Sequence, residues 1–342
     1  MLRQYCHLIL LLGTSCSVMA EDIQELEPVI VSAPLHKKQA ETVHPVNVLA
    51  GENLSLKQAS TIGETLKGEL GIHSMSFGSS VGQPVIRGQS GVRVQVLQNG
   101  LSSLDASGVS PDHANSTEAL LADRIEVLRG PASLLYGSGA IGGIVNVIDN
   151  RIPMFTPEST ELAFEQRYNS VSNQWSSVLK HDDGLDNFAW HIDGFYRTSD
   201  DYHVPTSSNG LGYVPNTDAE SWSGTLGASW IEDWGMLGFS YNHLDNNYGV
   251  PPVDELVRID LKQNRYDAKA EFYEPFSWVE TLKLRFGYND YQHAELEDGV
   301  TVGTQFDIQG IEGRAELVHK ELGFIDHGVF GFQALSKDSV AT

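Results

Sequence analysis

The chain of 342 residues carries 22 basic against 45 acidic residues, and the resulting net charge of −23 excludes a broad basic face for nucleic acid. With 41% hydrophobic and 20% charged residues, the chain is too apolar to be disordered. The 33 glycines and 9% aromatic residues are better suited to strands and turns than to helical bundles.

The first 20 residues are predicted to be an export signal. Arg3 supplies the positive charge, residues 8–12 supply the apolar core, and Val18-Met19-Ala20 forms a small-residue cleavage site before Glu21. No later apolar run reaches the ~18 residues that a membrane helix requires. The protein is therefore predicted to be exported and not to be a helical protein of the inner membrane.

The two cysteines lie inside this signal. A lipoprotein signal that uses Cys16 is the alternative, although residues 13–15 are a poor approach to a lipid-modified cysteine. If the signal is removed, Cys6 and Cys16 leave with it. Thiol catalysis, a cysteine-rich zinc site and a disulfide scaffold are then excluded.

Two zones follow the signal. Residues 21–42 are expected to form an extended polar segment on the periplasmic side, with one apolar patch that consists of Glu27, Pro28, Val29, Ile30, Val31, Ser32 and Ala33. Residues 43–150 alternate short apolar strands with small helices, which is typical of a compact mixed α+β domain. The strands predicted there include 84–88, 92–97, 125–128 and 144–148.

From residue 159 to residue 342, apolar and polar residues alternate with period two in segments of about ten residues, the length of a tilted strand that crosses a bilayer. Short turns are predicted at 183–186, 232–235 and 275–278, and long polar loops at 198–220, 247–263 and 292–304. This alternation favours an outer-membrane β-barrel with periplasmic turns and external loops. A soluble β-sandwich is the alternative, but its loops would not sort by end.

About nine strands fit into this region. Because bacterial barrels close on themselves with an even number of strands, we expect an incomplete barrel, and the chain to be the front part of a longer protein.

Enzyme motifs give no support for catalysis. Residues 137–142 match the dinucleotide pattern G-x-G-x-x-G, but a short helix is predicted before them and a strand after them, the reverse of the required order. The chain contains no P-loop, no nucleophile elbow and no H-E-x-x-H. A secreted enzyme with a β-rich domain is therefore disfavoured, and no catalytic residue or catalytic cofactor is predicted.

Residues 124–146, together with Val85-Ile86-Arg87-Gly88, resemble the plug domain of TonB-dependent outer-membrane receptors. The resemblance extends over the whole chain and implies a barrel of about 22 strands in all. It also implies that residues 27–33 are the TonB box. It further implies that three plug charges are paired inside the lumen, where they would hold and release the plug: Arg87, Glu126 and Arg129. The alternative for each is a satisfied surface charge.

Residues 104–114 are similar to the apical plug loop of the zinc-uptake receptors of this family, in which an adjacent Asp-His pair contributes to zinc binding. Asp112 and His113 match that pair, and both residue types are good zinc ligands, but two ligands do not complete a tetrahedron. The alternative is that Asp112 caps a turn while His113 faces water. Further candidates, expected near the extracellular end of the barrel, are His203, His243, His293 and Glu295, although solvated loops explain them equally well.

The resemblance therefore implies TonB-dependent active uptake of a metal ion, with zinc as the expected transported ligand, across the bacterial outer membrane. TonB and outer-membrane lipid are the expected partners. Ligand type does not separate zinc from copper or nickel. Alternatives are a receptor for haem, a siderophore or another metal chelate, and, in a different class, a surface adhesin or docking protein built on a barrel.

Overall fold

The computed structural model describes residues 46–342 except 138, 207–209, 211 and 253–254. The predicted export signal and the predicted TonB box at residues 27–33 lie outside the described residues.

The N-terminal domain is the predicted mixed domain, here called the plug, and it is built around a five-stranded sheet. The strand order is β1-β6-β7-β4-β5, in which β4 and β7 are parallel and the other neighbours are antiparallel. A separate hairpin pairs β2 with β3. The elements are β1 (Val46–Ala50), α1 (Gly51–Lys57), α2 (Ile62–Leu66), β2 (Ile72–Ser76), β3 (Gly82–Ile86), η2 (Gly91–Arg93), β4 (Val94–Gln98), β5 (Leu101–Ser102), β6 (Arg124–Leu128), η3 (Gly130–Tyr136) and β7 (Gly143–Ile148).

Local sequence explains several of these boundaries. Thr61 precedes α2, and its hydroxyl accepts a hydrogen bond from the backbone N–H of Glu64 at 3.3 Å, a standard N-cap. The apolar faces of the two α-helices and of the sheet meet in one core, to which Leu54, Leu66 and Ile125 contribute fully buried side chains. The strand predicted at 92–97 begins two residues later, because Gly91–Arg93 forms a 3-10 turn instead.

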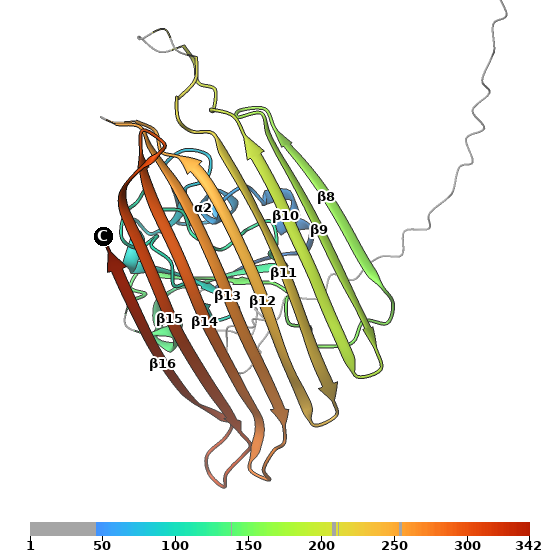
Figure 1. The fold of residues 1–342 in the computed structure, drawn as a ribbon. Coiled ribbons are helices and arrows are strands. Elements are labelled where there is room, and N and C mark those ends of the chain that lie inside the picture. Colours follow the sequence, from blue (N-terminus) through green and yellow to red (C-terminus); the bar gives the residue numbers. More distant parts are fainter. Residues whose placement is uncertain (1–45, 138, 207–209, 211, 253–254) are drawn as a thin grey trace, which may run out of the picture.

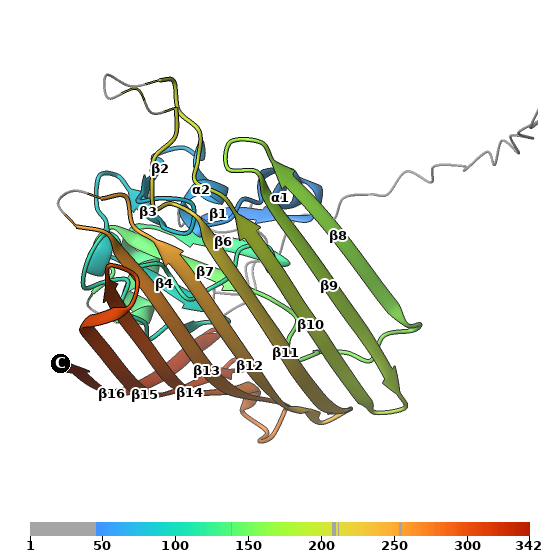
Figure 2. The same ribbon diagram turned by 45° about the horizontal axis from the view of Figure 1, so that its top comes forward.

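The second part of the chain is a nine-stranded antiparallel sheet in which each strand pairs with its neighbours in sequence, from β8 at one edge to β16 at the other. The sheet curves around the plug, which lies against its concave face (Figures 1 and 2). The strands are β8 (Glu161–Asn169), β9 (Gln174–Leu185), β10 (Phe188–Ser199), β11 (Ala219–Glu232), β12 (Gly235–Gly249), β13 (Val257–Tyr273), β14 (Val279–Glu297), β15 (Thr301–His319) and β16 (Gly328–Ala341).

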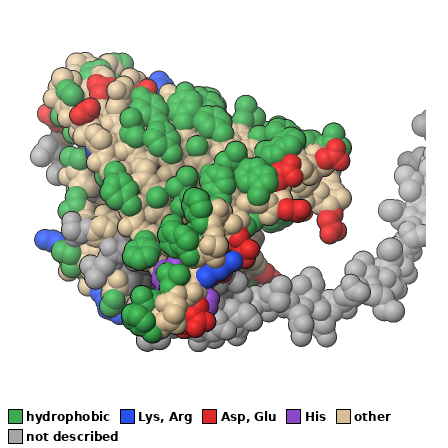
Figure 3. Space-filling view, turned by 90° about the horizontal axis from the view of Figure 1, so that it is seen from below, with side chains coloured by type: hydrophobic (Ala, Val, Ile, Leu, Met, Phe, Trp, Pro, Cys, Tyr) green, Lys and Arg blue, Asp and Glu red, His purple; other side chains and the backbone are tan. Residues whose placement is uncertain are grey.

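Successive side chains of these strands alternate between the plug and the outside. On β12, Ser240, Asn242 and Leu244 are buried toward the plug, whereas Leu237 and Phe239 are exposed on the outer face. Figure 3 shows hydrophobic side chains gathered over the surface seen from below. The apolar outer face is the surface that a lipid bilayer would cover. Among the described residues, no helix combines the length and apolarity needed to cross a membrane.

A row of tyrosines ends the apolar part of the outer face. Tyr241, Tyr266 and Tyr288 are cross-strand neighbours whose rings lie 5.0 and 6.0 Å apart. Beyond this row the outer face becomes polar, although the strands continue. Tyrosine rows of this kind are typical of membrane–water interfaces, where the ring is apolar and the hydroxyl is hydrated.

The strand lengths correct two predictions. The segment 292–304, predicted as a long loop, is mostly strand, because β14 extends to Glu297 and β15 resumes at Thr301. The predicted loop at 247–263 likewise shrinks to the residues between Gly249 and Val257. These strand ends could not be predicted from alternation, because their outward-facing residues lie beyond the apolar surface and are polar. Their inward-facing residues still pack against the plug. His293 is consequently a strand residue.

Candidate metal centre

The apical loop of the plug, residues 103–122, carries His113 into contact with the sheet. A turn closed by the hydrogen bond from the His113 N–H to the Ser110 carbonyl, at 3.3 Å, directs the imidazole inward, and the residue is 1% exposed. Gln83 of β3 supports this loop, because its amide donates to the backbone carbonyls of Ser107, Ser110 and His113.

The sheet supplies the facing side chains from β14. Its inward-pointing positions near one end are Tyr291, His293 and Glu295, two residues apart as the strand period requires. Tyr291 and His293 are fully buried, and the Glu295 side chain is 27% exposed. One plug residue and two strand residues therefore meet at this point.

The donor atoms of His113, His293 and Glu295 all lie within 4.8 Å of one another. His113 Nε2 is 3.0 Å from Glu295 Oε1, and His293 Nε2 is 3.9 Å from the same oxygen. The two imidazole centroids are 4.3 Å apart. Two nitrogens and one carboxylate oxygen at these separations suit a first-row divalent cation such as zinc.

The hydrogen bonds of His113 show which nitrogen can bind a metal. Its Nδ1 lies 3.1 Å from the carbonyl oxygen of Ala106, which only accepts hydrogen bonds, so Nδ1 carries the proton. In the neutral ring Nε2 then presents a lone pair to Glu295 Oε1. Two acceptors at 3.0 Å repel each other unless a cation, either a proton or a metal ion, lies between them.

The second imidazole, that of His293, has one ring nitrogen without a hydrogen-bond partner among the described residues. Nδ1 of His293 is 2.9 Å from the Tyr291 hydroxyl, whereas no described residue forms a hydrogen bond with its buried Nε2. A buried polar atom without a partner destabilises a fold by about 1–3 kcal/mol, so it calls for an explanation. A metal ion shared with His113 and Glu295 would satisfy this atom.

The surroundings are apolar and tightly packed. The Phe306 ring of β15 lies edge-on to both imidazoles, with centroid distances of 5.4 and 5.5 Å. A buried apolar cluster joins the apical loop to the sheet through Ala106, Ala114, Leu120, Leu121, Phe195, Leu244, Tyr248, Leu261, Tyr291 and Ile308. The loop position that carries His113 is therefore fixed by packing as well as by hydrogen bonds.

Three other predicted residues, and His319 of β15, lie outside this group. Asp112 accepts a hydrogen bond from the Ser110 hydroxyl within its own turn, so its role as a metal ligand stays a prediction. His203 is exposed in the loop after β10, and His243 points to the outer face, where it contacts the Trp222 ring at 5.0 Å. His319 lies at the far end of β15, paired with Val279.

The three predicted plug charges have contacts inside the plug. Arg129 donates to the Leu70 carbonyl at 2.9 Å and to Asn47 at 2.8 Å, and burial together with the nearby Arg87 charge lowers its pKa. Glu126 is fully buried on β6 with Arg124 at 3.8 Å, and Arg87 is exposed with a φ of 51°. Their predicted function in holding and releasing the plug stays a prediction.

Plug and sheet are joined by charges that the sequence did not single out. Glu118 in the apical loop pairs with Arg197 of β10 at 3.1 Å, and both side chains are more than nine-tenths buried. On the connection between β7 and β8, Arg151 pairs with Asp149 at 2.8 Å and approaches Asp267 of β13 at 4.0 Å. Burial alone would raise the pKa of Asp149, but Arg151 and hydrogen bonds from Asn99 and Gln98 hold it below its usual value.

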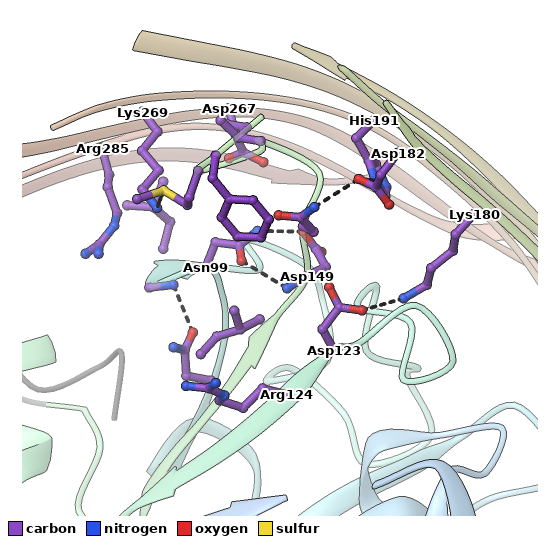
Figure 4. A pocket seen from close by; sticks show the side chains of 18 of the residues that line it. Asn99, Asp123, Arg124, Asp149, Lys180, Asp182, His191, Asp267, Lys269 and Arg285 are labelled. Carbon is purple, nitrogen blue, oxygen red and sulfur yellow. Dashed lines mark hydrogen bonds and ion pairs between the residues drawn. The ribbon is translucent and has the colours of Figure 1, made fainter. Parts of the chain in front are cut away.

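A cavity of about 930 Å³ lies between this connection and the sheet. Figure 4 shows Lys180, Asp182, His191, Asp267, Lys269 and Arg285 extending from the sheet toward Asn99, Asp123, Arg124 and Asp149 of the plug and its connection. Arg285 and His293 are eight positions apart on β14, which is roughly 26 Å along a strand. The cavity is therefore separate from the candidate metal centre.

Both the plug and most of the chain are similar to known proteins. Residues 38–144 match the TonB-dependent Receptor Plug Domain. Over 278 residues the chain is 27% identical to the "Vitamin B12 transporter BtuB" of Vibrio cholerae serotype O1, a match that covers 78% of this chain and 43% of the relative. Residues 38–144 therefore form a plug domain of the TonB-dependent receptor type, and the relative that matches most of the chain is named as a transporter.

Solved structures show the same fold. The "Copper transporter OprC" matches with a TM-score of 0.75 and 20% identity, covering 86% of this chain and 46% of that one. "The FrpB iron transporter from Neisseria meningitidis (F3-3 variant)" matches with a TM-score of 0.72 and 12% identity, covering 86% and 49%. The chain thus spans under half the length of these relatives. The similarity of residues 104–114 to zinc-uptake receptors stays a prediction, as does the total of about 22 strands.

Proposed function

We propose that this protein takes up a divalent metal ion, with zinc as the first candidate, across the bacterial outer membrane in a TonB-dependent manner. One observation carries the proposal. The plug and the sheet together place two buried imidazoles and a carboxylate within 4.8 Å of one another, and Nε2 of one imidazole has no partner among the described residues.

The size of the group favours an ion over a large chelate. His113 and His293 are 1% and 0% exposed, and Phe306 packs against both rings, so the space between their donor atoms is that of a single cation. Imidazole nitrogen and carboxylate oxygen together suit zinc, and a water molecule or a side chain from another part of the receptor would complete a tetrahedron. Copper and nickel accept the same donors.

The site is divided between two parts of the protein, and this division suggests a mechanism of release. His113 belongs to the plug, whereas His293 and Glu295 belong to the sheet. If TonB binds residues 27–33 and displaces the plug, His113 leaves the other two ligands and the cation loses part of its coordination. Energy spent on moving the plug would then lower the affinity for the metal at the moment of transport.

A metal chelate is the second candidate, because the relative with 27% identity is named as a vitamin B12 transporter. A chelate would have to bind above the plug, in contact with loops at the same end as Glu295. The two candidates differ in what competes for binding: chelators should remove a bare ion from its site, whereas a preformed chelate should bind without using His113 or His293.

The test is uptake of radioactive zinc by cells that lack other high-affinity zinc receptors and express the full-length protein. Wild type is compared with a His113→Ala/His293→Ala double variant and with His319→Ala as the control. We expect uptake to fall to background in the double variant and to remain in the control. Equal uptake by all three proteins, at equal amounts in the outer membrane, would refute the proposed site.

A further inference from the structure

An imidazole binds a metal through one nitrogen, and a hydrogen bond to the other nitrogen decides which one is available. The candidate centre has two imidazoles, so two acceptors are required behind them. The inference below rests on the proposed function, because it concerns how the same site holds its ligands.

The acceptor behind His113 is a backbone carbonyl. Ala106 is fully buried in the apical loop, and its oxygen lies 3.1 Å from His113 Nδ1. This contact needs no particular side chain, so the sequence around Ala106 cannot reveal it.

The group behind His293 is the hydroxyl of Tyr291, at 2.9 Å from Nδ1. Tyr291 is fully buried and two positions earlier on the same strand face. A hydroxyl can donate or accept, so two arrangements are open. If Tyr291 donated to Nδ1, Nε2 would carry the proton and could not bind a metal. If Tyr291 accepts from Nδ1, Nε2 presents its lone pair to His113 and Glu295.

We propose that Tyr291 is a positioning residue of the metal centre, whose hydroxyl oxygen accepts the Nδ1–H of His293 and thereby directs the Nε2 lone pair toward the cation. Phenylalanine at this position would leave the Nδ1–H buried without an acceptor whenever Nε2 bound a metal. The metal-binding form of His293 would then be the destabilised one.

Each supporting group belongs to the same part of the protein as its histidine. The Ala106 carbonyl lies on the plug with His113, whereas Tyr291 lies on the sheet with His293. Displacement of the apical loop would therefore remove His113 together with its supporting carbonyl. His293 would keep the orientation that Tyr291 gives it.

The experiment compares Tyr291→Phe with wild type in the full-length receptor, using zinc calorimetry and the visible absorption of bound cobalt(II). The control is Tyr241→Phe, which removes the same atom on the outer face, where it donates to Asn264 at 2.8 Å. We expect Tyr291→Phe to bind zinc about 10- to 100-fold more weakly and to give a different cobalt spectrum, as loss of a supporting hydrogen bond predicts. Tyr241→Phe should match wild type in both measurements.

The outcome separates this inference from the proposed function through a third protein, His293→Ala. If His293→Ala loses affinity while Tyr291→Phe keeps the affinity and cobalt spectrum of wild type, the positioning role is wrong and the metal site stands. If His293→Ala binds as wild type does, the proposed site is wrong, and the positioning role is wrong with it. Nitrogen NMR of zinc-loaded wild type gives a test without any variant: His293 should be protonated at Nδ1, and zinc bound to Nδ1 would overturn the inference.

Discussion

Replacement of His293 by alanine removes the imidazole whose buried Nε2 has no partner among the described residues. Zinc sites with four protein ligands contribute about 10–16 kcal/mol, so one ligand contributes roughly 3 kcal/mol. A loss of roughly 3 kcal/mol corresponds to about 100-fold weaker binding. We expect this decrease in the full-length receptor, and a similar one for His113→Ala.

The assay is calorimetric titration of the purified, metal-free receptor with zinc chloride. Asp112→Ala should weaken binding much less than His113→Ala, because the Asp112 carboxylate is hydrogen-bonded within its own turn. His319→Ala serves as the matched histidine control. It pairs with Val279, fourteen positions before His293 on β14, which is roughly 46 Å away along a strand.

Wild-type affinity in both His293→Ala and His113→Ala would show that the cluster is a packing arrangement of buried side chains and not a binding site. A large loss in Asp112→Ala, with none in His293→Ala, would instead move the site to the predicted Asp-His pair alone.

Three further predictions concern the packing of the sheet against the β7–β8 connection, the Asp149 carboxylate, and the predicted TonB box. A methyl group at Gly227 would overlap the Arg151 carbonyl of the β7–β8 connection, whereas a methyl group at Gly224, on the same strand, meets open space. Gly227→Ala should therefore lower the free energy of unfolding by about 1–3 kcal/mol, and Gly224→Ala should leave it unchanged. Thermal-unfolding midpoints of the solubilised receptor test this. Because the pKa of Asp149 is lowered in the folded protein, the stabilisation by its carboxylate should be complete above about pH 4 and be lost as the pH falls below that value. Asp149→Asn should remove this acid-dependent loss of stability from the unfolding curves. Proline at Val29 or Val31 removes a backbone donor and should abolish uptake while zinc binding remains, and unchanged uptake in both variants would point to a passive surface protein.

The fold was largely predictable from the chain because strand periodicity is a local property. Alternation of apolar and polar residues revealed the outer and inner faces of segments such as β10 and β13, and the tight turns marked their ends. The pattern became unreadable where the outer face turns polar beyond Tyr288. Residues 292–304 were therefore predicted as a loop, although they belong mainly to β14 and β15.

The candidate centre was predictable only in part. His113 was identified through the similarity of its loop to a known type of receptor, and the period-two spacing of Tyr291, His293 and Glu295 was a signal that could have placed them on one face. The meeting of His113 with Glu295, 182 residues later in the chain, depends on how the plug packs inside the sheet. No local pattern contains that information.

The most direct test of the proposed site is the position of the metal itself. Crystals of the full-length receptor grown with zinc, measured on both sides of the zinc absorption edge, would locate the ion by its anomalous scattering. We predict one strong peak within about 2.0–2.2 Å of His113 Nε2, His293 Nε2 and a Glu295 carboxylate oxygen. A zinc peak elsewhere in the receptor, with these three side chains unchanged and without a metal, would contradict the account.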